Sequence, residues 1–201
     1  MISTIAAPNR SVGVPLVMIA GICWSTSGLI YRLIENASPW QVLFYRSLAL
    51  FVMLAIWLGV NYRKNFFSIF SNSIGLSLAG GVCLGAAFTT YILALEYTSV
   101  PNAMFILAVA PFITALLGRM ILGETITGIT WICMIVTAVG LGVMVGEEVS
   151  LGKGLGEFFA LCAALGFSCM TISLRANQTN DLLPTIFLAS LTATIFAFFM
   201  M

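Results

Sequence analysis

The side chain most able to carry chemistry in this sequence is Arg46, a cation placed six residues into a strongly apolar stretch that starts at Trp40. If the stretch is a helix, Arg46 lies about 9 Å along it. An arginine within a membrane costs about 2.5–3.5 kcal/mol on insertion scales, so such a residue usually faces a cavity or a partner. The alternative is that the side chain snorkels to the nearer end of the helix.

Aromatic and hydroxyl side chains recur at helical spacing in the stretch before it. Trp24, Ser27 and Tyr31 share one face with Gly28, and such a face can line a cavity for an organic solute. Ordinary packing is the alternative, and Tyr31 near the end of the stretch also fits an interfacial aromatic residue.

A second polar group lies in the apolar stretch at residues 74–95. Thr89, Thr90 and Tyr91 offer neutral hydrogen bonds there. Thr89 and Tyr91 are candidate substrate contacts, although hydrogen bonding between helices is the favoured interpretation of the threonines. Gly81 and Gly85 precede them at a spacing that predicts a packing face.

The carboxylates give no sign of a proton relay, because each is predicted at a helix end. Glu124 is interpreted as complementing the positive start of a helix. Glu96 and Glu157 are interpreted as solvated helix-end groups, with proton exchange as the alternative. Pro111 interrupts its apolar stretch and removes a helical hydrogen bond, so it predicts either a hinge or a static bend.

Composition excludes several classes of function. The 201 residues include no histidine, and the five cysteines are scattered through apolar runs without paired spacing. We therefore expect no metal site, no disulfide framework, no cofactor and no enzymatic activity. A net charge of +1 argues against nucleic acid as a partner.

These side chains must be positioned by helices that cross a membrane. Hydrophobic residues make up 61% of the chain and charged ones 7%, against roughly 25% charged residues in soluble domains. The sequence predicts an all-α integral membrane protein, a multi-pass bundle of about seven transmembrane helices with the lipid bilayer as its solvent. The predicted spans are residues 12–31, 40–60, 74–95, 100–118, 126–146, 155–174 and 182–201.

Loop charges predict the orientation. Arg10, Arg63, Lys64, Arg119 and Arg175 fall on one side and only Arg32 and Lys153 on the other, which favours a cytoplasmic N-terminus. We expect the protein in a cell membrane, the inner or plasma membrane.

The sixth and seventh stretches resemble the first and second. Five segments separate the copies, and an odd number would insert the second copy upside down, as in the inverted repeats of secondary transporters. We therefore predict a first five-helix repeat at 12–146 and an incomplete second repeat at 155–201. The chain stops within an apolar run, so we expect a truncated form, with a genuine seven-helix protein as the alternative. The aligned pairs are Gly13 with Gly156, Ala20 with Ala163, Ser25 with Ser168, Arg32 with Arg175 and Pro39 with Pro184.

Several ordered motifs resemble the EamA-type domain of the drug/metabolite transporter superfamily. They are YILALEYTSVPNA at 91–103, APF at 110–112, LGETIT at 122–127, GLG at 140–142, GICWS at 21–25 and Pro39-Trp40 followed by Arg46. The resemblance implies ten helices in two inverted halves, a multi-pass transporter, and a cavity in which Arg46 binds an anionic group of the substrate.

The expected function is secondary transport of a small organic solute or metabolite by alternating access, since no Gly-x-x-x-x-Gly-Lys-Ser/Thr motif is present. The first alternative is a non-transporting or partner-dependent subunit. A homodimer is the partner that we expect in that case. A seven-helix receptor is a weaker alternative. Attachment of retinal would need a lysine within a span, and Lys64 and Lys153 both lie in loops, whereas a receptor of another type stays open.

Overall fold

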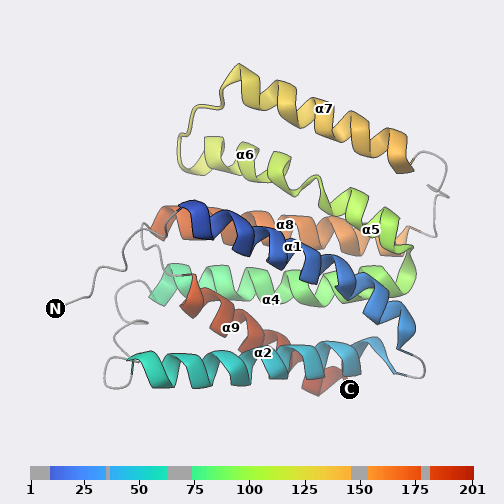
Figure 1. Ribbon diagram of the computed structural model, residues 1–201, viewed down its shortest axis with the longest axis vertical. Coiled ribbons are helices and arrows are strands. Elements are labelled where there is room, and N and C mark those ends of the chain that lie inside the picture. Colours follow the sequence, from blue (N-terminus) through green and yellow to red (C-terminus); the bar gives the residue numbers. More distant parts are fainter. Residues whose placement is uncertain (1–9, 35–36, 63–73, 146–153, 178–181) are drawn as a thin grey trace. The chain divides into compact units, whose positions relative to one another are not determined.

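The structure is a computed structural model that describes residues 10–34, 37–62, 74–145, 154–177 and 182–201 (Figure 1). Every regular element of these residues is an α-helix, which confirms the predicted fold class. The helices are α1 (Arg10–Leu33), α2 (Pro39–Tyr62), α4 (Ile74–Tyr97), α5 (Val100–Leu107), α6 (Ala110–Ile121), α7 (Gly128–Val145), α8 (Leu155–Asn177) and α9 (Leu183–Met200).

Six segments of the described residues are long and apolar enough to cross a membrane, and they match six of the predicted spans. The remaining predicted span, residues 126–146, corresponds to α7. This helix has 18 residues, near the lower limit for crossing a bilayer. The six segments are Gly13–Tyr31, Pro39–Asn61, Gly75–Tyr97, Val100–Ile121, Leu155–Ala176 and Leu183–Met200.

The chain divides into two units. Met1–Ala37 holds α1, and Ser38–Met201 holds the other helices. Within the second unit α4 packs against α8, α9 and α2, and α8 also packs against α5 and α6.

Glycine lets α4 approach its two main partners closely. A methyl group at Gly81 would lie 2.6 Å from Cβ of Leu188 on α9, and one at Gly166 of α8 would lie 2.9 Å from Cβ of Ala87. Helices in lipid associate by such close packing rather than by a hydrophobic driving force. The predicted packing face at Gly81 and Gly85 is thereby confirmed.

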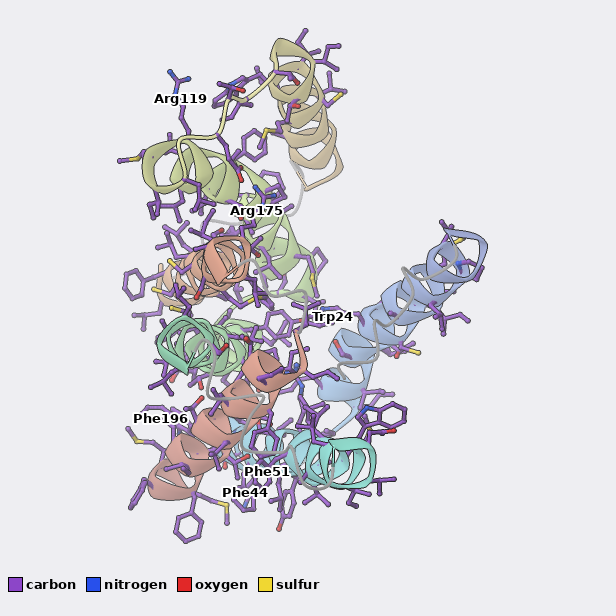
Figure 2. The ribbon with its side chains drawn as sticks, turned by 90° about the vertical axis from the view of Figure 1, so that its left-hand side faces the viewer. Trp24, Phe44, Phe51, Arg119, Arg175 and Phe196 are labelled. Carbon is purple, nitrogen blue, oxygen red and sulfur yellow. The ribbon has the colours of Figure 1, made fainter. Side chains whose placement is uncertain are left out.

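Aromatic rings join α2 to α9. Ring centroids lie 4.9 Å apart in Phe51 and Phe187, 5.9 Å apart in Trp40 and Phe196, and 6.1 Å apart in Phe44 and Phe198. Figure 2 shows Phe44, Phe51 and Phe196 gathered where the two helices meet. These contacts extend along both helices and hold α9 against α2.

The fourth span is a broken helix. Ser99 caps α5 by accepting a hydrogen bond from the amide of Asn102 at 3.3 Å, and α5 ends at Leu107. A new helix, α6, begins at Ala110 with Pro111 in its first turn. Proline has no N–H to donate to the preceding turn, so the interruption predicted at Pro111 is confirmed.

Candidate functional site

A cavity of about 590 Å³ lies beside α6 just after the helix break. Its size falls in the range of sites for small organic ligands, roughly 300–1,000 Å³. Residues of α6, the connector that follows it, α7 and α8 form the wall, which combines apolar side chains, five threonines and one pair of opposite charges. The lining residues are Ala110, Pro111, Thr114, Ala115, Glu124, Thr125, Ile126, Thr127, Thr130, Met134, Phe167, Thr171 and Arg175.

The charges on the wall form an ion pair. Nη1 of Arg175, in the last turn of α8, donates to Oε2 of Glu124 at 2.7 Å. The two side chains are 47% and 44% exposed, so the pair borders open space. In Figure 2, Arg175 is directed toward the segment after α6, whereas Arg119 is directed away from the helices.

The local sequence explains where Glu124 lies. Gly123 has a φ of +68°, a left-handed conformation that glycine adopts freely, and it ends α6 with a sharp turn. The amide of Glu124 then donates to the carbonyl of Gly118 at 3.3 Å. Because Gly118 has no side chain, Oε2 of Glu124 lies only 2.9 Å from where a methyl group would be.

The interpretation of Glu124 as a partner of the next helix end is wrong. Helix α7 begins at Gly128 and carries no acidic residue in its first turn. The carboxylate pairs with Arg175 instead, because the turn at Gly123 directs the chain back toward α8.

Hydrogen bonds hold α8 against the start of α6. The buried hydroxyl of Ser168 lies 2.9 Å from the carbonyl oxygen of Ala110 and 2.8 Å from that of Ala164, and its single proton is shared between these two acceptors. Thr171, one turn further, donates to the carbonyl of Phe167 at 2.9 Å. The side chains of α8 that line the cavity therefore belong to a helix that is hydrogen-bonded to the first residue of α6, next to the break.

Arg46 faces the interior of its unit rather than the end of its helix. The centre of its guanidinium lies 5.0 Å from the ring centroid of Phe88 on α4, a cation–π contact, and Tyr91 is close enough to interact with it electrostatically. Phe88 in turn contacts Phe167, at 6.3 Å between ring centroids. Since Phe167 lines the cavity, Arg46 lies behind its wall and not on it.

Thr89 and Thr90 border a second, smaller cavity of about 320 Å³ between α4 and α9. Each hydroxyl donates within its own helix, Thr89 to Gly85 at 3.0 Å and Thr90 to Ala86 at 2.9 Å. The expectation that these threonines bond from helix to helix is therefore wrong. Thr192 of α9 completes the polar part of the wall.

Trp24, Ser27 and Tyr31 all lie on α1. Helix α1 belongs to the other unit. Their assignment to a solute cavity therefore stays a prediction.

Glu157 is not the solvated helix-end carboxylate that we expected. Its Oε1 accepts a hydrogen bond from Nδ2 of Asn102 at 2.8 Å, and its Oε2 is buried. No group of three or more metal-ligating His, Cys, Asp or Glu side chains occurs among residues 10–34, 37–62, 74–145, 154–177 and 182–201.

Sequence reasoning missed the pairing of Glu124 with Arg175, which are 51 residues apart. One signal was present. The predicted topology placed the connectors that hold these two residues on the same side of the membrane, and opposite charges on adjacent loops attract.

A bundle of apolar helices with one broken span beside a ligand-sized cavity is the architecture of a multi-pass membrane transporter. The model of the EamA-like transporter family matches residues 11–146, and the chain belongs to this family. This match confirms the resemblance seen in the sequence motifs. No curated protein and no solved structure matches the chain.

Proposed function

We propose that the protein moves a small organic solute across the membrane as a secondary transporter, by alternating access. The observation that carries the proposal is the cavity beside the break between α5 and α6. Transporters typically build their binding sites from discontinuous helices, where irregular backbone lines a cavity. The threonines on the wall offer hydroxyl groups to a polar solute, while Phe167, Met134 and Pro111 offer apolar surface.

We further propose that Arg46 attracts an anionic group of the solute. The ion pair between Arg175 and Glu124 is the one found among the described residues, so Arg46 has no carboxylate counter-ion there. An uncompensated arginine within a span is costly, and function is the usual reason for keeping one. Tyr91 and Thr89 are proposed as further solute contacts in the same unit. For α1, taken by itself, solute binding by Trp24, Ser27 and Tyr31 is a separate proposal.

Alternating access requires α8 to move relative to α6. The pair of Glu124 and Arg175 joins the segment after α6 to the end of α8, so it would separate in one state and close in the other. A partly exposed ion pair contributes only about 0–1 kcal/mol to stability, so little free energy is needed to form and break it in each transport cycle.

Uptake by proteoliposomes tests the proposal. The assay would offer the purified chain amino acids, organic acids and organic cations. We expect at least one solute to accumulate above empty liposomes. Arg46→Ala should lower the uptake of an anionic solute about tenfold or more, since two opposite unit charges about 10 Å apart attract by roughly 1.7 kcal/mol at an effective dielectric constant of about 20. Thr171→Val keeps the shape of the wall and should raise KM by removing one hydroxyl.

Arg119→Ala is the matched control, because this side chain is directed away from the helices (Figure 2). It should transport like the wild type. If the folded wild-type chain moves no member of the panel, the proposed function is wrong. If Arg46→Ala and Arg119→Ala behave alike, transport stands but the role of Arg46 does not.

A further inference from the structure

Three polar side chains meet at the start of α8, far along the helix from the ion pair. Glu157 lies in the first turn of α8, Asn102 in α5, and Thr98 between α4 and α5. Nδ2 of Asn102 donates to Oε1 of Glu157 and to Oγ1 of Thr98, both at 2.8 Å. Oγ1 of Thr98 also lies 3.5 Å from Oε1 of Glu157.

The two oxygens of Glu157 differ in their surroundings. Oε1 receives these donors, whereas Oε2 is buried and has no hydrogen-bond partner among the described residues. Glu157 lies within the span Leu155–Ala176, and Asn102 beside it is only 3% exposed. Glu157 as a whole is half-buried, but Oε2 itself is shielded from water. A charged oxygen that has neither water nor a donor costs free energy, so Oε2 is unsatisfied in the ionised form.

Among the described residues, the elements around Glu157 supply no compensating cation. Helix α4 ends at Tyr97 against the first turn of α8, so closely that a methyl group at Gly156 would lie 2.8 Å from the carbonyl carbon of Tyr97. The negative end of α4 thereby faces the positive start of α8, and the two dipoles offset each other. Glu96 on α4 is a further negative charge, and it is exposed.

The described arginines of the same unit lie elsewhere. Arg46 contacts Phe88, Arg175 pairs with Glu124, and Arg119 is in the last turn of α6. On α5 the polar neighbour is the neutral Asn102. Lys153, four residues before Glu157, lies outside the described residues. Oε2 therefore has no cationic partner among the described residues, and a proton is the one cation that a single buried oxygen can hold by itself.

We propose that Glu157 is a proton-binding site that couples solute movement to a proton gradient, an inference that rests on the proposed function. A proton on Oε2 neutralises the carboxyl group while Asn102 keeps donating to Oε1, which acts as the carbonyl oxygen. When α8 moves away from α5, Oε2 gains access to water and the proton leaves as hydronium. The carboxylate is then solvated and takes up a proton before the site closes again.

Infrared difference spectroscopy tests proton binding without any need for transport. Purified protein in lipid would be compared at acidic and alkaline pH, in H₂O and in D₂O. We expect the carbonyl-stretch band of a protonated carboxyl group, shifted in D₂O, in the wild type. The band should be absent in Glu157→Gln and retained in Glu96→Gln, which alters the exposed neighbour.

Asn102→Leu keeps this test informative if Glu157→Gln does not fold. It removes the main donor to Oε1, so the band should move to the frequency of a less hydrogen-bonded carbonyl. A wild-type band that survives in Glu157→Gln, or that is unchanged in Asn102→Leu, would overturn the proposal. So would the absence of any such band at all pH values at which the protein is folded.

Transport then tests coupling. In proteoliposomes with a pH gradient the wild type should concentrate its solute, and Glu157→Gln should only equilibrate it, with at least a tenfold loss of accumulation. Glu157→Asp keeps a carboxyl group and should retain part of the coupling. Accumulation by Glu157→Gln at the wild-type level, or dependence on a Na⁺ gradient instead of pH, contradicts the proposal. A wild type that moves no solute contradicts the proposed function and leaves the infrared result standing.

Discussion

Gly118 and Gly123 together bring the carboxylate of Glu124 against the end of α6. A Cβ at Gly118 would lie 2.9 Å from Oε2, so the carboxylate would have to shift from the position in which it pairs with Arg175. Gly118→Ala should therefore weaken the ion pair and change the transport rate. The free energy of unfolding of this variant should change little, because the helix propensity that alanine gains over glycine, about 1 kcal/mol, offsets the weaker ion pair.

Thermal unfolding in detergent and uptake in proteoliposomes measure the two effects separately. Gly59→Ala on α2 is the control, since nothing lies within 4 Å of its added methyl group. Equal transport by Gly118→Ala and Gly59→Ala would argue against a role for the ion pair in the cycle.

The left-handed turn at Gly123 gives a second prediction at this scale. Gly123→Ala places a side chain at a φ of +68°, which costs about 1–2 kcal/mol for an L-residue. We expect the free energy of unfolding to fall by about this amount. Gly128→Ala, whose added methyl group meets nothing within 4 Å, should be neutral or slightly stabilising. Equilibrium unfolding in mixed detergent micelles gives both values.

Sequence reasoning at the residue scale succeeded where one helix sufficed and failed where two had to meet. It identified Arg46 as unusual because a charge in an apolar run is visible without a structure. It misjudged Glu124 and Glu157 because each acquires its partner from a segment more than 50 residues away. Their solvation depends on packing, which no local pattern records.

At the scale of elements, the glycine face of α4 determines how near α9 can come. An added methyl group at Gly81 would lie 2.6 Å from Cβ of Leu188, so Gly81→Ala forces the helices apart. We expect a loss of about 1–3 kcal/mol in the free energy of unfolding, as for other overpacked sites. Gly75→Ala on the same helix has open space around it and should not destabilise the protein. A neutral Gly81→Ala would mean that α9 can shift freely along α4.

The broken span gives the other prediction for elements. Pro111→Ala restores a backbone N–H and removes the restriction that separates α5 from α6. We expect slower transport, with unchanged or increased thermal stability and slower amide exchange at residues 108–112. Pro101→Ala is the control, because Pro101 follows the extended residue Ser99 at the start of α5 and so does not separate two halves of one span. Unaltered exchange and transport in Pro111→Ala would make the break a static bend.

The existence and length of the helices could be predicted, because long apolar runs read directly as spans. The break could be placed only near Pro111, since proline marks an interruption without fixing the residues at which each half ends. The contacts of α4 with α8 and α9 could not be predicted at all. The spacing of Gly81 and Gly85 predicts a packing face, but it does not indicate which helix packs against that face.

For the whole molecule, orientation is the property that loop charges predict and that remains to be measured. Single cysteines at Thr125 and Ser99, in a chain without its five native cysteines, would lie at opposite ends of the same broken span. With a cytoplasmic N-terminus, Thr125→Cys should react with an impermeant maleimide only from the inside and Ser99→Cys only from the outside. The reverse pattern would contradict the predicted orientation.

Assembly of the molecule is a separate expectation. A homodimer, the incomplete second repeat at 155–201 and the inner or plasma membrane as the location stay predictions from the sequence. Light scattering of the purified protein in detergent, corrected for bound detergent, would separate a monomer from a dimer.

The partners of α4 have a consequence for biosynthesis. The hydroxyl of Ser173 on α8 donates to the carbonyl of Leu76 on α4, a residue 97 positions earlier in the sequence. Ribosomes make the chain from its N-terminus, so α4 enters the bilayer well before α8 and α9 have been translated. Until then the glycine face of α4 is covered by lipid or by the insertion machinery. Helices α8 and α9 must displace that cover, so α4 acquires its packing against them only after both have entered the bilayer.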